Sequence, residues 1–133
     1  MSKLLAVVKD IQNEENLNII KFDFFGTTLT MMSLDLTNDL KIGSKVILTT
    51  KSTSIAIAKD FCGDISYSNQ IKTKIISINK GKLLCSIELS IASLVFESII
   101  TLNSADRLKL KIGDEVVAFI KASELLIEKV IYD

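Results

Sequence analysis

One segment near the end of the chain occurs twice, and this repeat constrains the fold more than any other feature. Residues 110–113 read Leu-Lys-Ile-Gly, and residues 40–43, seventy positions earlier, read the same. In both copies a valine lies three residues after the glycine, a lysine lies eight after it, and a hydroxyl residue lies two beyond the lysine. Two copies in the same register indicate an internal repeat. The 133 residues are therefore expected to form two related units, residues 1–62 and 63–133.

Each unit has the same predicted order of elements. Alternation of apolar residues predicts strands at 4–11, 17–24, 27–32, 45–50 and 54–59, and then at 71–78, 83–89, 94–102, 115–121 and 125–131. Residues 33–40 and 104–110 suit short helices, with Ser33 and either Asn103 or Ser104 as N-caps. Five strands with a helix between the third and fourth is the order of an OB-type barrel. We predict an all-β fold of two tandem OB-like five-stranded barrels, each with one short helix between strands three and four.

The composition indicates association. A unit of about 65 residues buries too little surface to be stable by itself, and 48% of the residues are hydrophobic. We expect the two units to pack on each other and the chain to form a homo-oligomer. The first ten residues hold too short an apolar run for a signal peptide, and no run suits a membrane helix. The sequence is therefore interpreted as cytoplasmic, with no membrane insertion.

Several kinds of chemistry are disfavoured by the residue types. There is no histidine, and Cys62 and Cys85 are too far apart for a zinc motif; we expect two reduced thiols, with Cys85 buried in a strand. A catalytic Ser–Lys dyad of Ser123 and Lys121 is disfavoured, because residues two apart in a strand share a face without needing to touch. No catalytic set is found in the sequence, and we predict that the protein is not an enzyme. The 16 basic residues are balanced by 16 acidic ones, and aromatic residues are 6%, which disfavours a nucleic-acid partner.

Anion binding is the remaining candidate chemistry. Lys121, Ala122 and Ser123 in one copy, and Lys51, Ser52 and Thr53 in the other, place an ammonium, a hydroxyl and backbone N–H groups where a strand ends. Converging donors of these kinds suit a small tetrahedral oxyanion. The alternative is that each lysine is a solvated charge that protects a sheet edge.

These residues resemble a known family. Residues 111–123, Lys-Ile-Gly-Asp-Glu-Val-Val-Ala-Phe-Ile-Lys-Ala-Ser, resemble the signature of the molbindin (Mop or TOBE) domains, which bind molybdate. Residues 66–71, Ser-Tyr-Ser-Asn-Gln-Ile, resemble the opening motif of the same domains, Ser-Ala-Arg-Asn-Gln-Leu. The tandem arrangement covers essentially the whole chain, so the resemblance is to a free-standing di-domain molbindin.

The resemblance implies OB-like barrels that exchange strands, an oligomer that is often a trimer, and oxyanion sites in interfaces. Molybdate or tungstate would be the bound ligand, with no organic cofactor and no direct cation ligands. Lys121 would supply charge and the backbone at Asn69 and Ala122 would supply N–H groups. Hydroxyl donors would come from three residues, namely Ser66, Thr101 and Ser123.

The sequence departs from the family pattern in three places. Ser68 stands where the family has arginine, the opening motif is missing from the first unit, and Met31 aligns with Thr101. The first-half site of Lys51, Ser52 and Thr53 is therefore expected to be incomplete. We expect each chain to supply one well-formed site, centred on Lys121 or composite with Lys51 across an interface, and any second site to be weaker or absent.

Three functions follow from the sequence. The favoured one is a cytoplasmic binding protein for molybdate or tungstate, in storage or homeostasis. The alternative is an interaction or regulatory module with degenerate anion sites, associated with a molybdate transporter. The third, an OB-fold nucleic-acid binder, is disfavoured by the charge balance.

Overall fold

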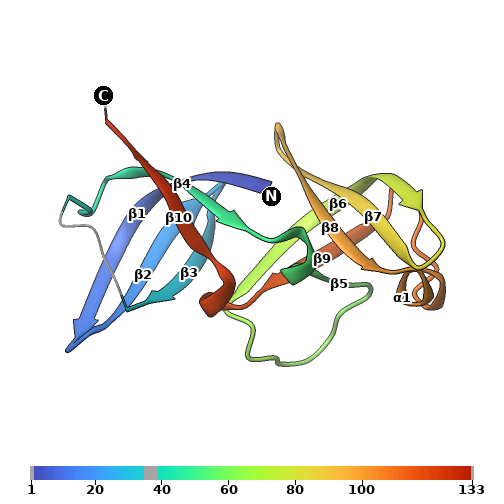
Figure 1. The fold of residues 1–133 in the computed structure, drawn as a ribbon, viewed down its shortest axis with the longest axis horizontal. Helices are drawn as coiled ribbons and strands as arrows, with labels where there is room; N and C mark the ends of the chain where they lie inside the picture. Colours follow the sequence, from blue (N-terminus) through green and yellow to red (C-terminus); the bar gives the residue numbers. More distant parts are fainter. Residues whose placement is uncertain (1, 35–38, 133) are drawn as a thin grey trace.

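The computed structural model describes residues 2–34 and 39–132. The chain in these ranges is nearly all β, in two five-stranded antiparallel sheets with strand orders β10-β4-β1-β2-β3 and β5-β9-β6-β7-β8. Figure 1 shows the two sheets beside each other along the long axis of the molecule. The elements in chain order are β1 (Ser2–Glu14), β2 (Leu17–Phe24), β3 (Thr27–Ser33), β4 (Lys45–Thr50), the 3-10 turn η1 (Ser52–Ser54), β5 (Ala56–Ala58), β6 (Asn69–Lys80), β7 (Leu84–Ile91), β8 (Leu94–Thr101), α1 (Leu102–Arg107), β9 (Glu115–Ile120), the 3-10 turn η2 (Ala122–Glu124) and β10 (Leu126–Ile131).

The predicted alternation of apolar residues correctly identifies which side chains are buried in the core. Leu4, Ala6 and Val8 of β1 are buried, while Leu5 and Val7 between them are exposed. In the second half, Ile71 and Ile75 of β6 are likewise buried. Cys85 is buried in β7, as predicted, and desolvation by burial raises the pKa of its thiol. One core cluster draws on buried side chains of both sheets.

The repeated glycine has a conformational reason. Gly43 and Gly113 have φ of +94° and +96°, a region that residues with a Cβ rarely adopt. The N–H of Gly43 donates to the carbonyl of Val8 at 2.8 Å, and the N–H of Gly113 donates to Ile75 at the same distance. Each turn is therefore bonded to the long first strand of its own half, at the point where that strand is bulged. The repeat in the sequence corresponds to a repeat in backbone geometry.

The two halves exchange their last strands. β10 pairs with β4 of the first half, and β5 pairs with β9 of the second half (Figure 1). Our assignment of each fifth strand to its own half is therefore wrong, whereas the strand exchange that the resemblance implied is confirmed within one chain. Periodicity marks a segment as a strand but does not identify its partner, and η1 and η2 redirect the chain to the other half. The division into residues 1–62 and 63–133 remains a prediction, since each sheet combines strands from both.

The helices differ in part from the prediction. α1 lies between the third and fourth strands of the second half, but its N-cap is Thr101 rather than Asn103 or Ser104, because the Thr101 hydroxyl accepts the N–H of Ser104. In the first half, Ser33 is the last residue of β3. The rest of that predicted helix falls largely on residues 35–38, outside the described residues.

Candidate functional site

A pocket of about 540 Å³ lies where the two halves meet. It is bounded by η1 from the first half and by the end of β8, the start of α1 and Lys121 from the second. The apolar residues that line it include Ile55, Ile99 and Leu84. The polar groups that line it are Thr53, Ser54, Tyr67, Thr101, Ser104, Lys121 and Glu124.

Three of the predicted site residues line this one pocket. Lys121 and Thr101 come from the second half, and Thr53 comes from the first. They meet because η1 packs against β8 across the junction. A buried hydrogen bond of 2.6 Å from the Ser98 hydroxyl on β8 to the carbonyl of Ile55 holds the end of η1 in place. The pocket is therefore a composite of the two halves.

Lys121 is the N-cap residue of η2, with an extended backbone at φ −68° and ψ 145°. Its side chain is exposed, and within the described ranges it has no ion-pair partner. A 3-10 turn also leaves its first N–H groups without intrahelical acceptors. The pocket therefore has an uncommitted ammonium beside the beginning of a turn.

Thr101 belongs to a short chain of hydroxyl groups. Its hydroxyl donates to the Ser104 hydroxyl at 3.0 Å and accepts the N–H of Ser104 at 3.1 Å. The Arg107 guanidinium also donates to the Ser104 hydroxyl, at 3.3 Å. The two hydroxyl groups are linked at one end of the pocket, and either can turn its hydrogen toward a ligand because a hydroxyl hydrogen rotates. Ser104 is thus a second candidate donor at this end of the pocket.

The side chain of Asn69 links the second half of the chain to β3 of the first half. Its side chain is fully buried, donates to the carbonyl of Thr30 at 2.9 Å and accepts the N–H of Thr30 at 2.6 Å. The carboxamide pairs with the free edge of β3 as the peptide group of another strand would. Both polar atoms of its side chain are hydrogen-bonded to Thr30, and Asn69 does not line the pocket. The predicted contribution of its backbone to a ligand site stays a prediction.

The remaining predicted residues lie outside the lining of this pocket. Ser66 and Ser68 are exposed in the joint between the halves, and Ser123 is exposed in η2. Ala122 is half-buried and Lys51 is exposed, while Ser52 is buried at the start of η1.

Four polar residues of the pocket were missed by the sequence reasoning: Ser54, Tyr67, Ser104 and Glu124. Tyr67 stands in the opening motif at a position where the family has alanine, so the resemblance gave it no role. Its ring lies 5.4 Å from the ring of Phe119, which fixes the joint against β9. Ser54 and Glu124 follow the two Lys-x-hydroxyl triplets directly, so extending the repeat by one residue would have found them.

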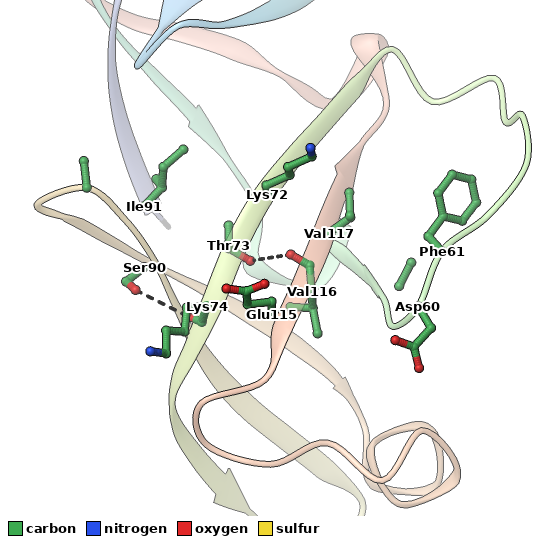
Figure 2. A pocket seen from close by; sticks show the side chains of 12 residues that line it. Asp60, Phe61, Lys72, Thr73, Lys74, Ser90, Ile91, Glu115, Val116 and Val117 are labelled. Carbon is green, nitrogen blue, oxygen red and sulfur yellow. Dashed lines mark hydrogen bonds between the residues drawn. The ribbon is translucent and has the colours of Figure 1, made fainter.

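A second pocket of about 630 Å³ contains none of the predicted site residues. Figure 2 shows Lys72 and Lys74 of β6 in it, together with the carboxylates of Asp60 and Glu115. Two of its hydroxyl groups are already used, since Thr73 donates to the carbonyl of Val116 at 3.2 Å and Ser90 to that of Lys74 at 3.4 Å. Because both of these hydroxyl donors are committed to backbone carbonyls, this pocket is a weaker candidate anion site than the pocket between the halves.

Comparisons with known proteins identify the family and the fold of the chain. A family model of the TOBE domain matches residues 65–127. The solved structure of the cytoplasmic molybdate-binding protein ModG, with molybdate bound, aligns with a TM-score of 0.85 over 94% of this chain and 93% of that one, at 19% identity. This likeness shows that the two share a fold. No helix in the described ranges has the length and apolar character needed to cross a membrane.

Two curated relatives match closely in sequence. Molybdenum-pterin-binding protein 1 of Clostridium pasteurianum is 38% identical over 64 residues, which is 47% of this chain and 94% of that protein. Molybdenum-pterin-binding protein 2 of the same organism is 36% identical over the same shares. Since nearly the whole of each relative is matched, the chain belongs to the molbindin family, the TOBE-domain family of the molybdenum-pterin-binding proteins.

Proposed function

We propose that this protein binds molybdate or tungstate as a tetrahedral oxyanion in the pocket between its halves, and that it serves in molybdenum or tungsten storage or homeostasis in the cytoplasm. The observation that carries the proposal is the convergence of Lys121 with hydroxyl groups of both halves on one pocket. The names of the relatives, two molybdenum-pterin-binding proteins and a molybdate-binding protein, support the choice of anion.

Each donor has a distinct role in the proposed site. Lys121 supplies the positive charge, and the hydroxyls of Thr53, Tyr67 and Ser104 supply neutral hydrogen bonds from different directions. A dianion that leaves water needs its lost hydration replaced by such groups. The site has no catalytic set, and we propose a binding protein rather than an enzyme, with no organic cofactor.

We further propose that the chain is a tandem of two TOBE-like units, residues 1–62 and 63–133, built as OB-like barrels with exchanged strands, and that it assembles into a homo-oligomer, with a trimer favoured. Leu83 and Leu84 beside the pocket are 81% and 54% exposed, which supports association at this face. Light scattering is expected to give a multiple of 14.7 kDa at micromolar concentration. A stable monomer would contradict the oligomer.

Titration calorimetry with molybdate, tungstate, sulfate and single-stranded DNA tests the binding function. Molybdate and tungstate are expected to bind and DNA is not. Lys121→Ala is expected to weaken molybdate binding about 10- to 150-fold, because a hydrogen bond to a charged group contributes about 1.5–3 kcal/mol.

Lys129→Ala is the matched control, since Lys129 is an exposed lysine of β10 outside the pocket. Equal affinity of wild type and Lys121→Ala would show that Lys121 is only an edge charge. Absence of oxyanion binding in the wild type would favour the alternative function, an interaction module associated with a transporter. That alternative is suggested by Ser68, which stands where the family has an arginine and so removes a charged donor.

A further inference from the structure

The outer faces of the two sheets carry different side chains at equivalent positions. Leu5 of β1 lies opposite Ile47 of β4, and Lys72 of β6 lies opposite Val117 of β9, seventy residues after Ile47. Lys72 is exposed, as expected on the solvated face of an antiparallel sheet. Leu5 takes its place in the first half and is 55% exposed. Two residues further along, Val7, 37% exposed, takes the place of Lys74.

The hairpins that end at these faces differ in the same way. Phe25 begins the two-residue turn between β2 and β3, and Ala92 begins the turn between β7 and β8. Both have a left-handed backbone, with φ of +48° and +52°, which is unfavourable for a bulky residue. The Phe25 side chain is nevertheless 49% exposed, and its ring is fixed edge-to-face against the buried Phe24, with the centroids 4.9 Å apart. An exposed aromatic residue on a strained backbone indicates a contact with another molecule.

The second pocket, of about 630 Å³, is the counterpart of this apolar surface. Its lining includes the residues equivalent to Leu5, Val7, Phe25 and Ile47, which are Lys72, Lys74, Ala92 and Val117. Equivalent residues that line one pocket show that the four first-half residues also lie around one place, which we call the apolar patch. The small side chain of Ala92 leaves open the position that a ring occupies in the first half.

The second pocket is suited to receive an aromatic side chain. Figure 2 shows Phe61 and Ile91 at opposite ends of it. The Phe61 ring is 37% exposed and is held edge-to-face against Phe119, with the centroids 5.1 Å apart. The pocket therefore has an apolar wall at each end that is not covered by this chain.

We propose that the apolar patch of one copy of this chain docks in the second pocket of another copy, with the Phe25 ring between Phe61 and Ile91. This inference rests on the homo-oligomer proposed above and identifies its contact. Patch and pocket are on different halves of the chain, so the contact is head-to-tail, and such contacts close into a ring, a trimer for example, when the rotation permits. Charges of both signs flank the two surfaces: Asp23 and Lys45 beside the patch, and Lys72, Lys74, Asp60 and Glu115 in the pocket.

The test is sedimentation velocity of the full chain at micromolar concentration. Phe25→Ser is expected to weaken association about 30-fold or more, as truncation of a central aromatic anchor commonly does. Leu5→Lys copies Lys72 and is a second patch variant, expected to dissociate likewise. Ala92→Phe copies Phe25, so the turn tolerates it, and it is expected to block association because the added ring fills the pocket.

Mixing the variants tests the head-to-tail contact directly. Phe25→Ser keeps the pocket and Ala92→Phe keeps the patch, so an equimolar mixture has one complete contact and is expected to form a heterodimer of twice 14.7 kDa and nothing larger. Leu17→Ser is the control, since Leu17 is 39% exposed at the other end of the same hairpin. It is expected to associate as wild type does, and circular dichroism checks that the variants are folded.

Two results would overturn this inference and leave the proposed oligomer standing: association of the patch or pocket variants that equals wild type, or a mixture of dissociated variants that stays monomeric. A monomeric wild type would refute both. Molybdate binding is measured separately by calorimetry on the same proteins, because neither Phe25 nor Ala92 lines the pocket between the halves.

Discussion

The side chain of Asn69 should contribute strongly to the stability of the junction between the halves. It is fully buried, and its carboxamide makes two hydrogen bonds to the backbone of Thr30 on the edge of β3, at 2.9 Å and 2.6 Å. Asn69→Ala leaves one N–H and one carbonyl of Thr30 without these partners. An ordinary hydrogen bond contributes about 0.5–1.5 kcal/mol and an unsatisfied buried group costs about 1–3 kcal/mol. Allowing for partial access of water, the expected loss is about 2–3 kcal/mol in the free energy of unfolding.

Urea denaturation followed by circular dichroism measures this loss. With an m-value of about 1–3 kcal/mol per molar urea, the midpoint is expected to fall by about 1 M or more. Asn69→Asp is a second variant, because it keeps an acceptor for the N–H of Thr30 but removes the donor and buries a charge; it is expected to be at least as unstable as the alanine variant.

Ser68→Ala is the matched control, since Ser68 is the exposed neighbour of Asn69. Exposed substitutions of this kind usually stay within about 0.5 kcal/mol of wild type. If Asn69→Ala is equally mild, the carboxamide does not hold the halves together, and the reasoning from its two hydrogen bonds is refuted.

Three further predictions concern the two repeated lysines, the carboxylate of Asp114 and the exchange of strands between the halves. Lys51→Ala is expected to weaken molybdate binding much less than Lys121→Ala, because Lys51 does not line the pocket; equal loss of affinity in calorimetry would show two equivalent sites. The pKa of Asp114 is lowered, first by the hydrogen bond from the Lys111 N–H and also by Lys59 at 3.3 Å. Its contribution to stability is therefore present above the ordinary carboxyl range and is lost as the pH falls through the lowered pKa. The melting temperature of Asp114→Asn should accordingly fall less than that of wild type as the pH is lowered. The same dependence of melting temperature on pH in both proteins would contradict this. Residues 1–62 expressed alone lack β10, the partner of β4, and are expected to be unfolded or associated by circular dichroism and light scattering until residues 63–133 are added; a folded monomer would contradict the role of strand exchange.

The sequence by itself determined the local structure. Alternating residues such as Ile20, Phe22 and Phe24 predicted which side chains are buried, because a strand exposes its two faces in turn. The repeat around Gly43 and Gly113 predicted two related units, and the structure gives both glycines the left-handed backbone that favours glycine. The family resemblance of residues 66–71 and 111–123 pointed to Lys121 and Thr101, which the structure places in one pocket.

Only the tertiary structure decided which segments meet. The exchange of β5 and β10 between the sheets could not be read from periodicity, because strand pairing depends on the direction the chain takes after η1 and η2. The contribution of Thr53 to the pocket, the pairing of Asn69 with β3 and the hydrogen bond between Ser54 and Glu124 all follow from that exchange. Each joins residues far apart in the sequence, and such contacts are set by the packing of the two halves rather than by local preference.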